Sequence, residues 1–341
     1  MTRVLFAGSP GIAVPCLNAL AALEEGRPPA IELAGVLTNP DSPRGRRGER
    51  EPTEVSAAAA ALSEARLNRG LPAIPQIKPE KLGAGAREQV LALKPDLLVS
   101  FAYGRIFGPR FLSLFPLGGI NIHPSLLPRF RGPSPIPAVI LAGDGETGIS
   151  IQKLAPEMDS GDILVQERFP LGGRETAALL GEDTARRSAV LLGGLLKEIA
   201  GDPREVLDRA RPQEGEPSYC SLLSKEAGRI DWSRSAAAID AQIRAYTPWP
   251  LSFTQSGGDL LYILEAAPAG GENGAEGSGA APEAVPGGVL GVDRDRGILV
   301  QTGEGILAVS RLQYRARKAM DWKSFLNGAR NFTGSRLGGG A

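Results

Sequence analysis

The sequence predicts two domains of different class: an α/β domain with a doubly wound, mainly parallel sheet, followed by a smaller β-barrel of OB-like type. In the first half, apolar runs typical of buried strands alternate with helical patterns, and this alternation favours a parallel sheet. In the last third, short apolar segments recur at regular intervals, which is typical of a small barrel. A chain of 341 residues is long enough to bury two cores.

The elements of the α/β domain follow in order. Residues 3–7, 31–38 and 96–100 are expected to be buried strands, with helices near residues 14–24 and 81–93 between them. The turn that follows the first strand lacks the G-x-G-x-x-G spacing and the Walker Lys-Ser/Thr pair, so it is interpreted as a tight turn and not as a nucleotide loop. Such a fold places ligand sites at the carboxyl ends of its strands.

A long helix near residues 176–200 closes this domain, which we place at residues 1–202. Glycines and prolines then mark a linker at residues 203–218. The second domain is predicted at residues 219–330, with a tail at 331–341. Its expected elements are a helix near 236–245 and strands at 251–254, 260–264, 288–292, 298–302 and 306–312.

Within the second domain, residues 266–287 are rich in Gly, Ala, Glu and Pro and show no apolar periodicity. A segment of this composition buries too little surface to order itself, so we expect a flexible insertion.

The composition is that of a globular protein, with 42% hydrophobic and 22% charged residues and a formal net charge of zero. Binding to a polyanion would therefore depend on local basic patches. Cys16 and Cys220 form no C-x-x-C pair, which argues against a zinc site or a disulfide framework. The N-terminus is too soon interrupted by Gly8 and Pro10 to be a signal peptide or a membrane span, so we expect a cytoplasmic protein.

The candidate site begins at a short apolar run, residues 117–122, which predicts a buried strand. Two-residue spacing places Asn121 and His123 on the same face at its exit. Pro124 and Pro128 then enforce a rigid loop whose backbone groups are expected to stay free for a ligand. His123 is the single histidine of the chain, and imidazole is the side chain best suited to proton transfer at neutral pH.

Asp159 is the candidate carboxylate to orient this histidine. It lies in a Gly-containing loop between two strand-like segments, residues 148–154 and 162–169. An alternative stays open, because a histidine beside prolines is often a satisfied loop residue and a D-S-G-D run is often a turn.

Four motifs occur in a fixed order: N-I-H-P-S-L-L-P from residue 121, P-R-F-R-G-P-S-P-I, A-G-D-G-E-T-G, and M-D-S-G-D-I around residue 159. In these the chain resembles the folate-dependent formyltransferases, whose fold is a Rossmann-like sheet. The resemblance implies that Asn121, His123 and Asp159 are catalytic. It also implies a folate site, with one wall formed by Ser125, Leu126, Leu127 and Pro128 and the other by Phe101, Tyr103 and Gly104.

In that chemistry an amine attacks the formyl carbon of 10-formyltetrahydrofolate, and tetrahydrofolate leaves through N10. We expect the Asn121 amide and a protonated His123 to donate to the oxyanion of the tetrahedral intermediate. Asp159 would hold the imidazole and assist loss of the amine proton. No metal is required.

The acceptor is predicted from the rest of the chain. The resemblance extends to family members that formylate initiator methionyl-tRNA, in which a P-x-G-R-G loop enters the acceptor stem. Candidate tRNA contacts are therefore Arg44, Arg46 and Arg47 in that loop, with Arg315 and Lys318 in the second domain. We expect a monomer, with initiator methionyl-tRNA and 10-formyltetrahydrofolate as partners and no membrane.

Two alternative hypotheses for the function remain open. One is a formyltransferase or formyl hydrolase that acts on a small substrate with the same three residues, against which the arginine loop and the complete second domain argue. The other is a tRNA-binding protein whose first domain has become structural, which the intact Asn121, His123 and Asp159 make improbable.

Overall fold

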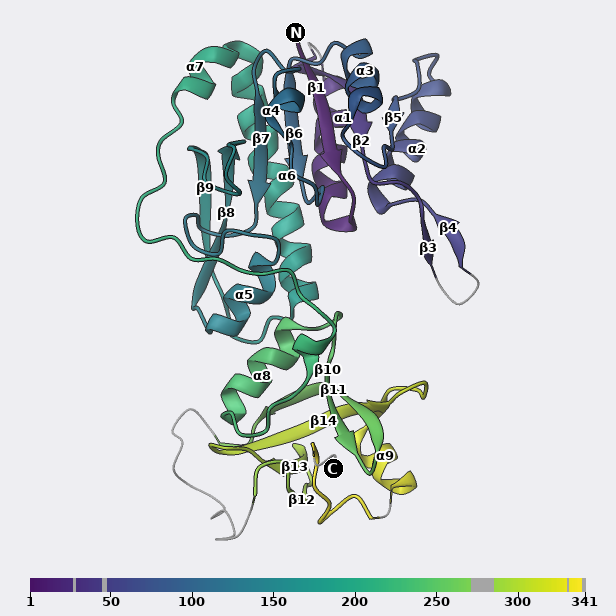
Figure 1. Cartoon of the computed structure of the whole chain (residues 1–341), viewed down its shortest axis with the longest axis vertical. Helices are drawn as coiled ribbons and strands as arrows, with labels where there is room; N and C mark the ends of the chain where they lie inside the picture. The colour runs from purple at the N-terminus through teal and green to yellow at the C-terminus, as the bar shows by residue number, and fades with distance from the viewer. Residues whose placement is uncertain (27–28, 45–47, 271–284, 330, 339–341) are drawn as a thin grey trace. The chain divides into compact units, whose positions relative to one another are not determined.

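The computed structural model describes the chain except residues 27–28, 45–47, 271–284, 330 and 339–341 (Figure 1). The chain divides into two compact units. The first comprises Met1–Pro135, Glu146–Pro170 and Gly181–Ser221, and the second comprises Ile136–Gly145, Leu171–Leu180 and Leu222–Ala341.

The first unit is built on a seven-stranded sheet of order β5-β2-β1-β6-β7-β8-β9. The first five of these strands pair in parallel, and β8 and β9 continue the sheet in antiparallel pairing. The predicted doubly wound, mainly parallel sheet is thus confirmed. The strands are β1 (Thr2–Gly8), β2 (Ile31–Leu37), β5 (Gln76–Ile77), β6 (Leu97–Phe101), β7 (Gly119–His123), β8 (Glu146–Lys153) and β9 (Ile163–Pro170).

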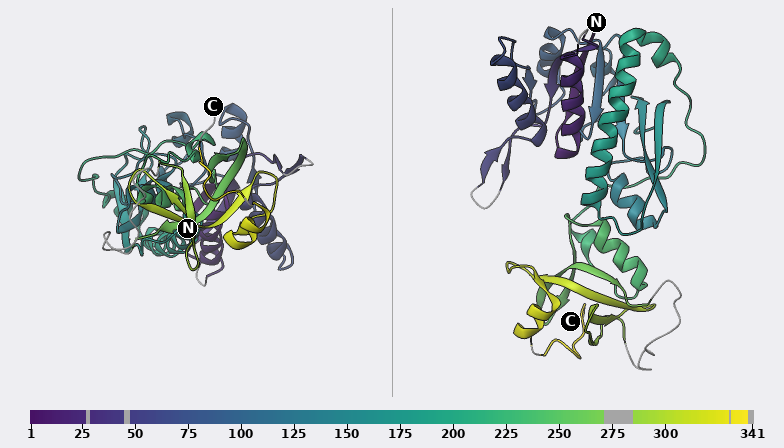
Figure 2. Two further views of the ribbon diagram at one scale, coloured as in Figure 1. Left: turned by 90° about the horizontal axis from the view of Figure 1, so that it is seen from below. Right: turned by 180° about the vertical axis from the view of Figure 1, so that it is seen from behind.

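Helices cover both faces of this sheet. The helices α1 and α6 lie in front of the strands in the view from behind in Figure 2, whereas α3 and α4 lie in front in Figure 1. The central strands are buried almost throughout, as their apolar runs predict. The helices are α1 (Val14–Glu24), α2 (Glu54–Leu67), α3 (Ala84–Ala92), α4 (Pro109–Leu112), α6 (Ala177–Gly201) and α7 (Pro203–Asp208), with α5 (Pro135–Ala142) mostly in the second unit.

A row of aromatic rings supports the chain that follows β6. Tyr103 stacks on Phe107 with ring centroids 5.2 Å apart, Phe107 on Phe111 at 5.5 Å, and Phe115 continues the row. All four rings are buried in one apolar cluster with Leu98 and other residues of the sheet. This packing fixes the course of the chain at the carboxyl end of β6.

The strands β3 (Ser42–Arg44) and β4 (Glu49–Glu51) form an antiparallel pair, here called the hairpin, on either side of the predicted arginine loop. The hairpin projects from the first unit (Figure 1). Asp41 anchors its base, because its carboxylate lies 2.7 Å from Lys78 Nζ and its carbonyl accepts a hydrogen bond from Arg50 Nη2 at 2.7 Å. Arg46 and Arg47 lie outside the described residues, and of Arg44 only the main chain is described.

The second unit contains an antiparallel sheet of order β10-β11-β14-β13-β12, with β15 paired to β14. The sequence predicted a smaller OB-like β-barrel here; a second domain built on an antiparallel sheet is confirmed, and within the described residues its strands form an open path from β10 to β12. Helix α8 packs on β11 and β14. The elements are α8 (Ala236–Ala245), β10 (Ser252–Ser256), β11 (Asp259–Pro268), β12 (Val289–Asp293), β13 (Gly297–Gln301), β14 (Ile306–Tyr314), β15 (Met320–Asp321) and α9 (Trp322–Gly328).

The boundaries differ from expectation in three places. The predicted insertion at 266–287 begins too early, because β11 continues to Pro268, and its central residues 271–284 lie outside the described chain. The predicted linker at 203–218 begins with α7 and belongs to the first unit. The predicted tail packs against the second sheet, where Val289 N donates to Ser335 O at 2.9 Å and Leu337 is buried.

Candidate active site

Strand β7 places Asn121 and His123 at the carboxyl edge of the sheet. It lies between β6, where Ser100 pairs with Asn121, and β8, where Gln152 pairs with Asn121 and Ser150 with His123. The two residues lie two positions apart on a strand, so their side chains leave from the same face. His123 is 4% exposed, and Asn121 is half-buried.

Asp159 joins these two side chains from the loop between β8 and β9. Its Oδ1 accepts from Gln152 Nε2 at 2.9 Å and from Asn121 Nδ2 at 3.4 Å, and its Oδ2 accepts from the Gly132 amide at 2.9 Å. The same Oδ2 lies 3.5 Å from His123 Nδ1. Asn121, His123 and Asp159 therefore meet at one point, as the sequence predicts.

The loop that carries Asp159 is held in a tight and unusual backbone conformation. Asp159 has φ of +54°, a left-handed value that non-glycine residues seldom adopt. Two residues later, a Cβ on Gly161 would lie 1.8 Å from the Lys153 carbonyl oxygen, so only glycine fits there. The aspartate is thus presented by a loop with little freedom to move.

Both ring nitrogens of His123 face hydrogen-bond acceptors. Nε2 lies 2.9 Å from the Phe130 carbonyl oxygen, while Nδ1 faces the Asp159 carboxylate. Burial lowers the pKa of His123 below its ordinary value of 6.5, against the charge of Asp159 and the Phe130 carbonyl, which both raise it. The resting ring is therefore neutral at pH 7, yet it is surrounded by groups that would accept from a second N–H.

An NMR titration of tag-free protein tests this balance, since His123 is the only histidine and gives one set of imidazole signals. We expect a midpoint below 6.5, because burial is the larger effect. In Asp159→Asn the midpoint should fall further, because the opposing negative charge is gone. In the parent protein, a folded pKa below 6.5 means that His123 of the unfolded chain is protonated first as the pH falls. The free energy of unfolding therefore decreases as the pH falls through 6.5 toward the pKa of the folded protein. A midpoint above 6.5, or a rise in the variant, would contradict this account.

The two expected folate segments leave the carboxyl ends of neighbouring parallel strands, β6 and β7. Phe101, Tyr103 and Ser125 are buried as whole residues, main chain included. Gly104 is exposed with φ of +80°. Leu126 is half-buried, whereas Leu127 and Pro128 are buried.

The backbone of the loop after His123 is less free than expected. Ser150 Oγ donates to the Ser125 carbonyl at 2.7 Å and accepts from the Leu127 amide at 3.1 Å. The Leu127 carbonyl accepts from Gln166, and the Pro128 carbonyl accepts from Ser218. A ligand at this loop would thus have to use the second lone pairs of its carbonyl groups.

Comparison with known proteins identifies the family. Residues 3–192 match the family described as Formyl transferase, and residues 222–330 match the Formyl transferase, C-terminal domain. A methionyl-tRNA formyltransferase of Treponema denticola is 46% identical over 97% of this chain and 98% of its own. The chain belongs to the methionyl-tRNA formyltransferase family.

Solved structures of similar fold are more distant in sequence. HypX from Aquifex aeolicus, in complex with tetrahydrofolic acid, has a TM-score of 0.57 at 17% identity and covers 97% of this chain, which spans 48% of the HypX chain. An N-formyltransferase from Helicobacter canadensis, in complex with folinic acid and dTDP-3-aminofucose, has a TM-score of 0.57 at 17% identity and covers 92% of this chain and 100% of its own. At these identities the likeness shows the shared fold.

In this member of the methionyl-tRNA formyltransferase family, two glutamines that sequence reasoning missed surround the aspartate. Gln152 lies in the predicted strand but reaches Asp159 only because β8 pairs with β7 in a register that places it opposite Asn121. Gln213 lies in the predicted linker and donates to the Asp159 carbonyl at 2.8 Å. The strand pattern was a weak signal for Gln152, and no sequence signal indicated Gln213.

Two of the predicted tRNA contacts of this family member lie in the second unit. Arg315 and Lys318 are exposed on the turn between β14 and β15 of the second unit. Arg311, on β14 before this turn, is paired with Glu265 at 3.2 Å. Among the residues that the structure describes, there is no cluster of His, Cys, Asp and Glu able to hold a metal ion. No helix in the described ranges is long and apolar enough to cross a membrane.

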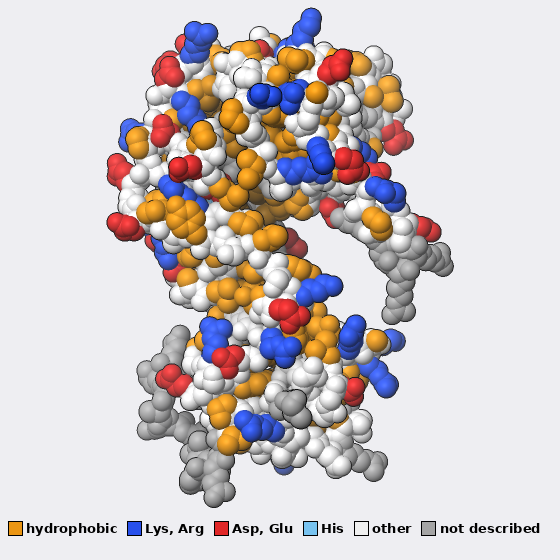
Figure 3. Space-filling model, in the orientation of Figure 1, with side chains coloured by type: hydrophobic (Ala, Val, Ile, Leu, Met, Phe, Trp, Pro, Cys, Tyr) orange, Lys and Arg blue, Asp and Glu red, His pale blue; other side chains and the backbone are white. Residues whose placement is uncertain are grey.

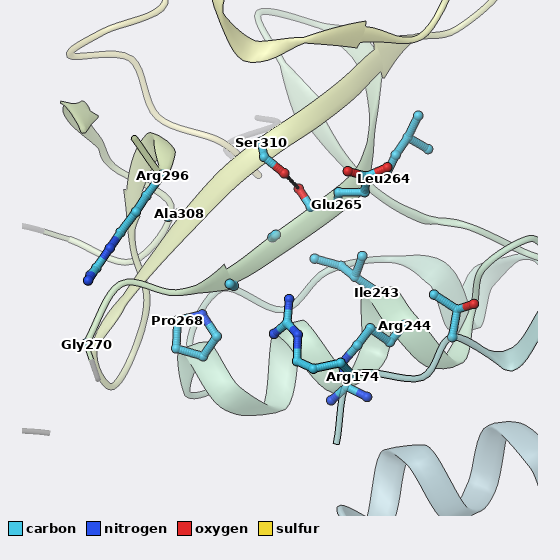
Figure 4. Close-up of a pocket in the computed structure, with 13 residues that line it drawn as sticks. Arg174, Ile243, Arg244, Leu264, Glu265, Pro268, Gly270, Arg296, Ala308 and Ser310 are labelled. Atoms are coloured by element: carbon cyan, nitrogen blue, oxygen red, sulfur yellow. Dashed lines mark hydrogen bonds between the residues drawn. The ribbon is translucent and has the colours of Figure 1, made fainter. Parts of the chain in front are cut away.

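The second unit also contains a cavity of about 530 Å³ that the sequence did not reveal. Arg174 and Arg244 lie together on one side of β11, and Arg296 comes from the turn before β13 (Figure 4). Arg244 is already engaged, because its Nε donates to Asp240 at 2.9 Å and its Nη1 donates to the Glu175 carbonyl. Arg174 lies 3.7 Å from Asp240 and is 65% exposed.

Proposed function

We propose that the protein transfers the formyl group of 10-formyltetrahydrofolate to the amino group of initiator methionyl-tRNA. The observation that carries the proposal is the meeting of Asn121, His123 and Asp159 at a strand end, in a chain that matches a methionyl-tRNA formyltransferase at 46% identity over nearly its whole length. Because translation initiation takes place in the cytoplasm, this function also favours a cytoplasmic protein.

Asn121 is proposed as a donor to the oxyanion. When the amine attacks, a C–N bond forms and the formyl oxygen becomes negatively charged. The Asn121 amide lies at the end of β7 and is half-buried, where a donor acts with little competition from water. A single preorganised donor of this kind stabilises a tetrahedral intermediate by about 2.7 to 4 kcal/mol.

Asp159 and His123 are proposed to manage the proton. Asp159 accepts the proton that the amine loses as its nitrogen becomes bonded to carbon. His123 is neutral at rest. As negative charge develops on the formyl oxygen, His123 takes that proton from Asp159, and its two ring nitrogens then donate to the Phe130 carbonyl and the Asp159 carboxylate. The proton passes to N10 of tetrahydrofolate as the C–N10 bond breaks and the carbonyl re-forms. The sum is one formyl group moved and one proton exchanged between two nitrogens.

The folate is proposed to bind between the chain that follows β6 and the loop that follows β7. Gly104 would contribute main-chain groups and Leu126 a half-buried apolar side chain, while the buried Phe101, Tyr103 and Ser125 would hold these two segments in place. The HypX and Helicobacter canadensis structures, which contain folate compounds, share this fold.

The tRNA is proposed to contact localised arginines, not a uniformly basic surface. On the face seen in Figure 3, Lys and Arg side chains are interspersed with Asp and Glu, in keeping with the net charge of zero. The proposed contacts are Arg44, Arg46 and Arg47 of the predicted arginine loop, Arg315 and Lys318 of the β14–β15 turn, and Arg174 and Arg296 of the cavity in Figure 4.

A parallel transfer assay tests the proposed function. Labelled 10-formyltetrahydrofolate is offered with initiator methionyl-tRNA, elongator methionyl-tRNA or glycinamide ribonucleotide. We expect label on the initiator tRNA, and little on the other two acceptors. Label on the small acceptor alone, or free formate with none, would keep the chemistry but replace the acceptor. Binding of tRNA without any transfer would favour the tRNA-binding protein.

A further inference from the structure

The segment of residues 211–220, here called the strap, ties together the two loops that present the catalytic residues. It lies between the two family matches, which end at residue 192 and resume at residue 222. One end pairs with the start of β9, just after the Asp159 loop, and the other pairs with the loop after His123. The main-chain bonds are Arg211 N to Ile163 O at 2.9 Å, Ile163 N to Arg211 O at 2.7 Å, Arg131 N to Ser218 O at 2.8 Å and Cys220 N to Arg131 O at 2.8 Å.

Gln213 is the strap side chain that reaches the catalytic aspartate. Its Nε2 lies 2.8 Å from the Asp159 carbonyl, 2.9 Å from the Gly161 carbonyl and 3.2 Å from Gln152 Oε1. Its Oε1 accepts from Arg131 Nη2 at 2.7 Å and from Nε at 3.1 Å. Both ends of the amide are therefore used, and the partners fix which end is nitrogen.

The contact with Gln152 has a second effect. Because Gln152 Oε1 accepts from Gln213, the Gln152 amide must turn its NH₂ toward Asp159, where it donates to Oδ1 at 2.9 Å. Gln213 thus acts on Asp159 in two ways. It holds the main chain of a residue whose φ is +54°, and through Gln152 it orients the carboxylate.

We propose that Gln213 is a positioning residue for formyl transfer, which keeps the Asp159 carboxylate in place against His123 and Asn121. The inference rests on the proposed function, because it concerns the same site. Gln213 itself touches neither His123 nor Asn121 in any of its hydrogen bonds described here. Its effect should therefore appear in turnover and not in substrate binding.

Two variants and a matched control test the proposal. Gln213→Leu removes all five contacts. Gln213→Glu keeps the acceptor for Arg131, loses the donor to Asp159, Gly161 and Gln152, and adds a negative charge close to the catalytic pair. Glu214→Gln changes the exposed neighbouring residue in the same strap and serves as the control.

We expect kcat to fall by about 10- to 100-fold in both Gln213 variants, as for a displacement of about 1 Å at a catalytic group, with KM for both substrates within about twofold of the parent. In Gln213→Glu the pH dependence of kcat should also move toward higher pH, since an added anion favours the protonated forms of His123 and Asp159. The His123 NMR titration should shift in the same direction, independently of activity.

The results separate the inference from the proposed function. If the parent protein transfers formyl to methionyl-tRNA but folded Gln213→Glu matches Glu214→Gln in kcat, pH dependence and His123 titration, the positioning role is wrong. If Gln213→Leu does not fold, the isosteric Gln213→Glu still decides the question. If the parent protein transfers no formyl group, the proposed function fails, and a Gln213-dependent shift of the His123 titration would still show the coupling.

Discussion

Asp159→Asn is expected to lower the rate of formyl transfer by about 100- to 10,000-fold, the range for loss of a positioned general base. The asparagine amide cannot take the amine proton. It also places an NH₂ where either Gln152 Nε2 or the Gly132 amide now donates to the carboxylate at 2.9 Å. One of these donors would lose its acceptor, so the side chain would be held less firmly.

Single-turnover transfer from 10-formyltetrahydrofolate to methionyl-tRNA measures this effect without product release. Asp162→Asn is the matched control, because it makes the same change three residues along the same motif, at a half-buried residue whose main-chain carbonyl accepts from Lys153 N. Folding of both variants is compared by thermal unfolding. An Asp159→Asn protein that transfers formyl as fast as Asp162→Asn would remove Asp159 from the mechanism.

Asn121→Ala is expected to reduce kcat by about 100- to 1,000-fold with little change in KM, as for removal of one oxyanion donor. The loss falls on kcat because the amide donates fully only when charge is present on the formyl oxygen. Its weak contact with Asp159, at 3.4 Å, is lost as well, but the Gln152 and Gly132 contacts keep that carboxylate in place.

The control for this variant is Asn68→Ala, which removes an exposed asparagine at the end of α2. The informative comparison is between kcat and KM for the folate. A rise in KM with kcat unchanged would mean that Asn121 binds the donor in its ground state, and the oxyanion role would be lost.

The sequence predicted the central residues of the site because they depend on local geometry. Two-residue spacing at the end of an apolar run places Asn121 and His123 together, and the alternation of β7 bears this out. Asp159 could be proposed but not joined to them from spacing alone. Its approach depends on the antiparallel pairing of β7 with β8, a long-range property that no local pattern encodes.

The errors had physical causes as well. Residues 211–220 contain two prolines and a glycine, and that composition indicates the absence of a helix or strand, not the absence of contacts. In β11, register shifts between Ile263 and Ala266 break the two-residue alternation, so the strand seemed to end about four residues too early. The short helices α4 and α7 lacked the length from which a period can be read.

The course of the strap has a consequence for dissecting the protein into modules. A fragment cut at residue 202, where the sequence suggests a border, would keep Asn121, His123 and Asp159 but would lack Gln213 and Ser218. The first unit itself extends through Ser221 and so contains the whole strap. Any chimera that exchanges residues 222–341 should therefore be joined after Ser221, so that the strap stays with the loops it ties together.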